Sequence, residues 1–129
     1  MDLSTLDVKA VAEEGATLEV RHPVTGNLID GMSVKVLGTD SATYRNAVKA
    51  RIRRAANQRK KQDFDPDKAE RDALELLADL TIGWDGVELD GEPLKCTREN
   101  CIMVYGRFPW LREQVDEFVA DRANFLPSA

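Results

Sequence analysis

Two short segments in the N-terminal third of the chain alternate apolar and polar residues. These are TLEVRH (17–22) and MSVKVL (32–37). A repeat of two residues is typical of a half-buried strand. The stretch between them contains Gly26 and Gly31, which suit the backbone angles of turns. The pattern predicts a β-hairpin over 17–37. Because an isolated two-stranded hairpin is only marginally stable in water, we expect it to pack on helices or on another copy of the chain.

Four later segments follow the helical period of 3.6 residues. In the first, Tyr44, Val48 and Ile52 recur at every fourth position and form one apolar stripe. Asp65 can cap the second segment, and Pro66 suits its first turn. The predicted helices are, in chain order, about 41–62, about 66–81, about 98–105, which Gly106 is expected to end, and about 109–123.

These elements predict a mainly helical α+β fold, with an N-terminal β-hairpin followed by about four helices. Residues 1–16 show only a weak pattern and end near Gly15. We expect them to form a loosely ordered arm in front of a single domain over 17–126. The length of 129 residues suits one domain with one core.

Charge and composition narrow the functional classes. Charged residues make up 32% of the chain and the formal net charge is −5, which favours solubility and argues against a general nucleic-acid role. No run approaches the roughly 18 apolar residues that a bilayer-spanning helix needs. The start MDLSTLDVKA lacks the features of a secretion signal, and two cysteines do not form a disulfide framework. We therefore expect a cytosolic protein with no membrane partner.

The stretch IGWDGVELDGEPLKC (82–96) carries four carboxylates within eight residues and is the first candidate for a metal site. A calcium loop that began at Asp85 would need oxygen ligands where Val87 and Leu89 stand. Asp-Gly pairs are typical of turns. We interpret the stretch as a turn-rich connector between two helical parts, with Trp84 as its apolar anchor.

The remaining candidate chemistry is weak. Cys96 and Cys101 lack the second ligand pair of a zinc site, and a helix start between them is expected to hold the sulfurs too far apart for a disulfide. The only histidine, His22, stands alone, and no glycine-rich phosphate loop is present. The sequence therefore predicts no catalytic residue, no metal site and no cofactor, and we expect a protein that is not an enzyme.

A run of basic residues is the main alternative. Seven Lys and Arg side chains lie between 49 and 61, which suits phosphate contacts, but no aromatic residue is interleaved with them. The acid-rich residues 63–75 follow directly and partly cancel the positive field. A solvated helix face, or pairing with acidic residues of a neighbouring copy, is favoured over nucleic acid.

With catalytic, metal and nucleic-acid sites disfavoured, binding of a protein partner through apolar residues is the remaining candidate function. Large apolar residues concentrate towards the C-terminus, and a stripe at helical spacing usually belongs to a core. Self-association or a helical client would use those residues that stay accessible. The candidate partner-binding or anchor residues are Trp84, Phe108, Trp110, Leu111, Phe118 and Phe125.

Several short motifs follow one another along the chain in an order that resembles a known family. The motifs are GTDSATYR (38–45), Trp84, DGEPL (90–94), TREN (97–100), Pro109 to Leu111, and Phe125-Leu126. Together with the strand–turn–strand pattern before them, they resemble the tail assembly chaperones of long-tailed bacteriophages over most of 17–126.

The resemblance implies a role that composition and spacing do not show. Such chaperones bind the long, helical, aggregation-prone tape-measure protein before the tail tube forms, and the finished particle lacks them. Many are made in two lengths by a translational frameshift, and the longer form contacts tube subunits. The resemblance implies a short form in the host cell cytoplasm. Its partners would be the tape-measure protein, a frameshift-extended form of itself and tail tube subunits.

Two other functions stay open at this point. The first is a small structural tail or connector protein of the virion. The second is a nucleic-acid-binding protein that uses the basic segment 49–61.

Overall fold

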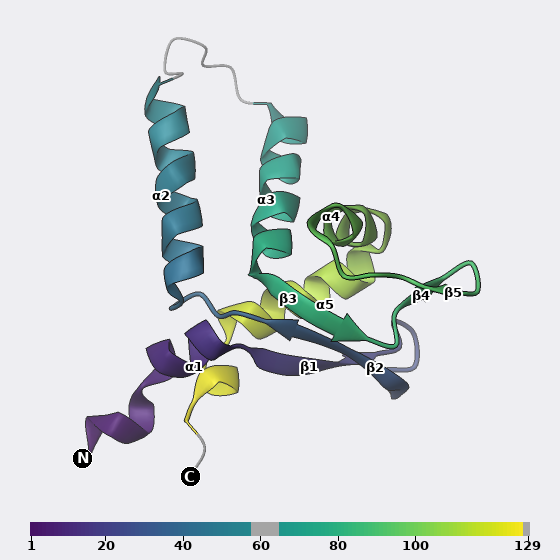
Figure 1. Ribbon diagram of the computed structural model, residues 1–129, viewed down its shortest axis with the longest axis horizontal. Coiled ribbons are helices and arrows are strands. Elements are labelled where there is room, and N and C mark those ends of the chain that lie inside the picture. Colours follow the sequence, from purple (N-terminus) through teal and green to yellow (C-terminus); the bar gives the residue numbers. More distant parts are fainter. Residues whose placement is uncertain (58–64, 128–129) are drawn as a thin grey trace.

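A computed structural model of the protein describes residues 1–57 and 65–127 (Figure 1). The helices are α1 (Val8–Glu14), α2 (Ala42–Asn57), α3 (Pro66–Leu80), α4 (Arg98–Arg107) and α5 (Pro109–Ala120), with the 3-10 turns η1 (Leu3–Leu6) and η2 (Arg122–Phe125). The strands are β1 (Ala16–Arg21), β2 (Leu28–Val36), β3 (Thr81–Asp85), β4 (Glu88–Leu89) and β5 (Glu92–Pro93). The predicted mainly helical α+β fold is confirmed.

The strands β1 and β2 form the predicted hairpin, with Leu18 opposite Val34. β3 pairs with the other edge of β2, so the sheet has the antiparallel order β1-β2-β3. Val34 lies opposite Trp84 in this second ladder. The alternating pattern found both strands because one face of the sheet is buried. However, β2 begins at Leu28, four residues before the predicted segment, so the loop of the hairpin is shorter than expected.

The core lies between this sheet and the helices. The sheet contributes the fully buried Val20, Val34 and Val36, and α5 contributes the buried Leu111, Val115 and Val119. The helix α5 contacts both β1 and β2, and α3 packs against α4 (Figure 1). The expected apolar face of α5 is therefore turned towards the sheet.

The N-terminal arm differs from its prediction. Residues 8–14 form α1, and the side chain of Asp7 accepts a hydrogen bond from the backbone N–H of Ala10. Ala12 is buried, and its carbonyl accepts a hydrogen bond from the N–H of Gly38 at 3.0 Å. The expectation of a loose arm is wrong here, because one small residue packs closely against Gly38, a contact that hydrophobic periodicity does not register.

The helices α2 and α3 stand side by side and rise from the sheet as an antiparallel pair (Figure 1). The apolar stripe predicted on α2 is only partly used. Tyr44 packs against the core, whereas Ile52 is 62% exposed, and α2 has no buried residue. The predicted end of this helix, at 58–62, lies outside the described residues.

The connector predicted over 82–96 is more ordered than expected. After α3 the chain enters β3 directly, so Trp84 stands in a strand of the main sheet. A small hairpin, β4–β5, follows. Asp90 has φ of 55° and Gly91 has φ of 85°, as a two-residue hairpin turn of type I′ requires. The Asp-Gly turn was predicted, but a strand of five residues was too short to show a period.

The last two helices correct two predicted boundaries. Thr97 caps α4 as expected, but α4 continues through Gly106 to Arg107. A methyl group on Gly106 would lie 3.4 Å from Leu74 of α3, an ordinary contact distance, so the prediction that this glycine ends the helix is wrong and the helix packs on α3 through it. The helix α5 ends at Ala120, and Asp121 then caps the turn η2.

Candidate partner-binding pocket

An open pocket of about 350 Å³ lies beside the β4–β5 hairpin. Its walls come from three separate parts of the chain: the middle of β2, the residues around β4 and β5, and the corner between α4 and α5. Large apolar side chains that line it include Ile29, Met32, Leu89, Leu94, Phe108, Trp110 and Leu111. A concave apolar surface of this kind suits side chains of a protein partner.

The hairpin wall is held in place by Trp84. The indole Nε1–H donates a hydrogen bond to the carbonyl oxygen of Leu94 at 2.8 Å, and the N–H of Leu94 donates to the carbonyl of Val87 at 2.9 Å. Trp84 is half-buried against the core. Trp84 therefore anchors the pocket wall, and it does not line the pocket itself.

A glycine allows the hairpin to lie against β2. Gly86 has φ of 71°, and a Cβ atom there would lie 2.2 Å from the carbonyl oxygen of Gly31. No side chain fits at that distance. The close approach brings Val87 and Leu89 to the same side as Met32, where all three line the pocket.

The opposite wall is an aromatic corner. The N–H of Phe108 bonds to the carbonyl of Val104 and closes α4, and Pro109 begins α5 at once. The rings of Phe108 and Trp110 meet edge to face, with centroids 6.5 Å apart. The guanidinium of Arg107 lies 5.3 Å from the centroid of Phe108. Both rings stay half-buried and accessible from the pocket.

The structure brings together only some of the six predicted anchor residues. Phe108, Trp110 and Leu111 line the pocket, and Trp84 supports it through Leu94. Phe118 and Phe125 lie elsewhere and pack edge to face, with ring centroids 5.8 Å apart.

These two rings have different environments. Phe125 is buried, and its ring fixes the C-terminal turn against Gly38. Phe118 lines a shallow groove beside β1 with Leu18 and Gln114. Gln114 exchanges two hydrogen bonds with the backbone of Arg21, so it covers part of the β1 edge.

Sequence reasoning missed the pocket residues that precede α2 and those of the hairpin. Ile29 was placed in the hairpin loop and Met32 only in a strand, and Leu94 was noted only as part of the DGEPL motif. One signal was available. Val87 and Leu89 are two apolar residues at strand spacing within an otherwise polar stretch.

The four carboxylates of residues 85–92 are exposed, and Glu88 also borders the pocket. Asp85, Glu88, Asp90 and Glu92 form no ion pair with any residue that the structure describes. Among residues 1–57 and 65–127, no group of three or more His, Cys, Asp or Glu side chains is placed to hold a metal ion.

The two cysteines are close but not bonded. Their sulfurs lie 3.8 Å apart, so the expectation that the helix start separates them is wrong, although both thiols are free. Burial raises the pKa of Cys101 to about 12 and also raises the pKa of Cys96. A thiol whose pKa is raised by burial is a poor nucleophile at neutral pH.

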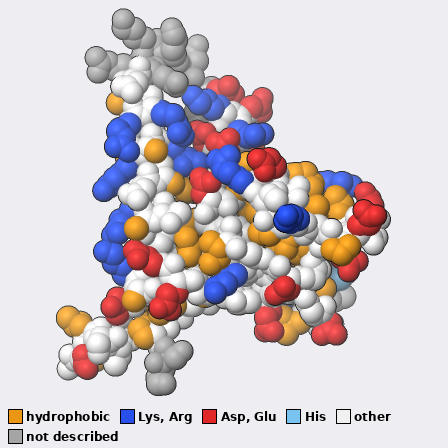
Figure 2. All heavy atoms as spheres, viewed as in Figure 1, with side chains coloured by type: hydrophobic (Ala, Val, Ile, Leu, Met, Phe, Trp, Pro, Cys, Tyr) orange, Lys and Arg blue, Asp and Glu red, His pale blue; other side chains and the backbone are white. Residues whose placement is uncertain are grey.

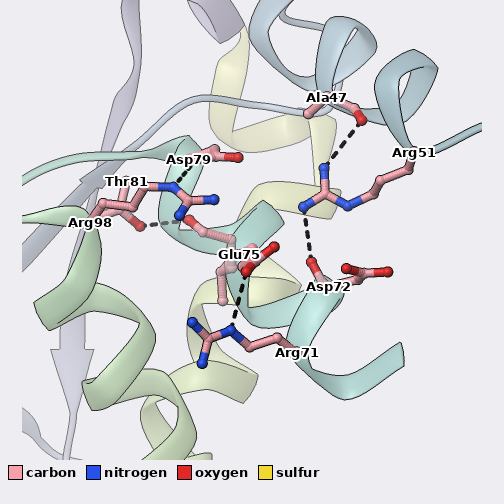
Figure 3. Close-up of polar contacts among 9 residues, drawn as sticks. Ala47, Arg51, Arg71, Asp72, Glu75, Asp79, Thr81 and Arg98 are labelled. Atoms are coloured by element: carbon pink, nitrogen blue, oxygen red, sulfur yellow. Dashed lines mark hydrogen bonds and ion pairs between the residues drawn. The ribbon is translucent and has the colours of Figure 1, made fainter. Parts of the chain in front are cut away.

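One arginine of the basic segment 49–61 makes hydrogen bonds that link α2 to α3 (Figure 3). Arg51 of α2 donates to the backbone carbonyls of Ala47 and of Asp72, each at 3.1 Å, and so ties α2 to α3. Within α3, Arg71 pairs with Glu75 at 3.1 Å, and Arg98 of α4 pairs with Asp79 of α3 at 2.8 Å (Figure 3). The basic residues 59–61 lie outside the described part of the chain.

One family model matches most of this architecture. The model of the YdaY prophage protein matches residues 39–128. The chain belongs to the YdaY prophage protein family. The match begins after the β1–β2 hairpin and includes the β4–β5 hairpin and the aromatic corner of the YdaY-family pocket.

The family confirms the phage origin that the motif order implied, at the level of a prophage-associated protein. No curated protein and no solved structure matches this YdaY-family chain. Within the described residues, no helix is both long and apolar enough to cross a membrane.

Proposed function

We propose that this YdaY-family protein is a non-enzymatic tail assembly chaperone of a bacteriophage, and that it binds the tape-measure protein and keeps it soluble. The observation that carries the proposal is the open apolar pocket between the β4–β5 hairpin and the α4–α5 corner. The chaperone acts in the host cell cytoplasm and leaves before the particle is complete.

The pocket suits the chemistry of such a client. A tape-measure chain presents apolar faces of long helices, which aggregate when nothing covers them. An amphipathic helix binds in a hydrophobic groove through a few apolar anchors at helical spacing. Trp110 and Phe108 are large aromatic side chains at the mouth of the site, and aromatic residues dominate the energetics of many interfaces. Charged residues make up 32% of the chain, which favours solubility of a complex.

Co-expression with the tape-measure protein of the same gene cluster tests the proposal. We expect the wild-type chain to raise the soluble fraction of the client and to be recovered with it. Leu89→Asp places a charge in the pocket and should abolish both effects. Val24→Asp adds the same charge at a site in the β1–β2 loop that is 85% exposed, and it should change neither.

Two results of this co-expression experiment would contradict the proposal or its assignment to the pocket. If the wild-type chain neither solubilises nor retains the tape-measure protein, the proposal is wrong. If the two Asp variants behave alike, the pocket is not the client site.

The same proposal includes a longer, frameshifted product of the gene and contacts with tail tube subunits. Mass spectrometry of infected cells should detect peptides that extend beyond this chain, whereas purified particles should contain neither form. Recovery of the chain in stoichiometric amounts from particles would instead indicate a structural component of the virion.

A further inference from the structure

The outer face of α2 carries a basic stripe that nothing in the described structure covers. Arg45, Lys49, Ile52, Arg53 and Ala56 fall within about 100° around the helix axis at the α-helical period, and all five are exposed. Lys49 and Arg53 form no ion pair with any described residue. The apolar side chain of Ile52 lies beside them at the edge of the stripe and is 62% exposed.

The pocket is complementary to this stripe in polarity and in charge. Its mouth is apolar, and Glu88 lines it. Residues 85–92 beside it contain four carboxylates and no Lys or Arg. The next basic residues in sequence are Lys95 and Arg98, and Arg98 is paired with Asp79. Arg107 lies over the ring of Phe108. In contrast, α2 carries five Lys and Arg residues and no Asp or Glu.

The two surfaces lie at opposite ends of the molecule. Figure 1 shows α2 at the left edge and the β4–β5 hairpin at the right. In Figure 2, Lys and Arg side chains run along the edge formed by α2, and Asp and Glu side chains gather at the hairpin. A single copy therefore cannot bring the stripe to its own pocket, and complementary surfaces of this kind pair between copies in a head-to-tail manner.

We propose that the α2 stripe of one copy docks on the pocket of a second copy. Ile52 enters the apolar mouth beside Trp110, while Lys49 and Arg53 face the carboxylates of the hairpin. The occupant is thus a basic amphipathic helix with one aliphatic anchor.

The contact also regulates the pocket. A docked α2 covers the surface on which the proposed client binds, so free chaperone protects its own apolar site, and a client must displace the neighbouring copy. This consequence rests on the proposed function, whereas the docking itself does not.

Sedimentation of the purified full-length chain tests the docking without any client. We expect association that grows with concentration and that weakens between about 50 mM and about 500 mM salt, because exposed charges are screened over shorter distances at the higher salt. Lys49→Glu/Arg53→Glu and Ile52→Asp should each abolish it. Arg54→Glu lies on the same helix, roughly half a turn away from Ile52, and serves as the matched control that should associate normally.

Mixing two charge-reversed variants tests directly whether α2 pairs with the pocket. Glu88→Lys/Glu92→Lys reverses the hairpin and should also prevent self-association. Mixed with the α2-reversed variant, it should form a complex, because the intact α2 of one variant meets the intact pocket of the other. Far-UV circular dichroism of each variant shows that it is folded.

Several outcomes would overturn the docking. They are a wild-type chain that stays monomeric at both salt concentrations, an Arg54→Glu variant that fails as completely as Lys49→Glu/Arg53→Glu, and a mixture of reversed variants that does not associate. Salt-sensitive binding of duplex DNA to a monomeric wild-type chain, lost in Lys49→Glu/Arg53→Glu, would assign the stripe to nucleic acid. Client binding is measured separately, so the proposed function can hold when the docking fails.

Discussion

Trp84 combines two roles in one side chain. Its ring packs against the core opposite Val34, and its Nε1–H fixes the carbonyl of Leu94 in the pocket wall. Gly86, two residues later, allows the chain to lie against Gly31. The pocket wall therefore depends on Trp84, which does not line the pocket, as well as on the residues that do.

Replacing Trp84 separates packing from hydrogen bonding. Trp84→Ala should lower the free energy of unfolding by about 2–4 kcal/mol, because a large half-buried ring leaves a cavity. Trp84→Phe keeps most of the packing and loses one hydrogen bond, so it should cost about 1 kcal/mol. Urea denaturation measures both values. Equal losses in the two variants would show that the hydrogen bond alone holds the wall.

Gly86 and Gly91 form a matched pair for backbone strain. Both have positive φ, which costs a residue with a side chain about 1–2 kcal/mol. Around Gly91 nothing lies within 4 Å of an added Cβ, whereas at Gly86 the carbonyl oxygen of Gly31 stands in the way. Gly86→Ala should therefore destabilise clearly more than Gly91→Ala in thermal unfolding. Similar losses would mean that the hairpin can move away from β2 at little cost.

At the scale of elements, the α2–α3 pair is attached to the fold mainly through α3. The helix α3 buries Leu74, Leu77 and Leu80, while α2 buries none of its side chains. Arg51 is the polar link between the two helices, and its Nε has no hydrogen-bond partner among the described residues. An element with so little buried surface is expected to open more readily than the core.

Arg51→Met tests this link. The variant keeps the apolar stem and loses the two hydrogen bonds to the carbonyls of Ala47 and Asp72, so α2 should detach from α3 at a cost of about 1 kcal/mol. Hydrogen exchange should become faster in α2 and stay unchanged in α5. Arg53→Met, on the outer face, is the control and should leave both rates unchanged. Faster exchange throughout the molecule would show that α2 is part of the global unfolding unit.

At the scale of the whole molecule, the two ends of the chain close the fold together. The turn η2 packs against α1, and Phe125 and Ala12 both lie at Gly38, where the sheet leads into α2. Asp40, two residues after Gly38, forms an ion pair with Arg122 of η2 at 2.7 Å. Residues more than eighty positions apart in sequence are therefore neighbours around one glycine.

Phe125→Ala should destabilise the entire protein. A fully buried aromatic ring that is removed from a core costs about 3–5 kcal/mol, a large part of the stability of a small domain. Leu126→Ala changes the adjacent residue, which is 44% exposed, and should cost little. Guanidinium denaturation followed by Trp fluorescence compares them. A small loss in Phe125→Ala would mean that η2 frays independently of the core.

The sequence by itself determined the features that depend on neighbouring residues. Alternation predicted β1 and β2, Thr97 and Asp65 capped the helices they were expected to cap, and the Asp90-Gly91 turn formed as its residue types require. Each of these signals is local because backbone angles and hydrogen bonds close to a residue decide it.

Only the tertiary structure decided the site. Met32, Leu89 and Trp110 come from three distant parts of the chain, and their packing around Gly31 and Gly86 makes the pocket. It also decided that Ile52 stays outside the core while Phe125 lies inside it. In the sequence, an apolar residue that will be exposed cannot be told from one that will be buried. Its burial depends on the residues that pack against it, and these lie far away along the chain.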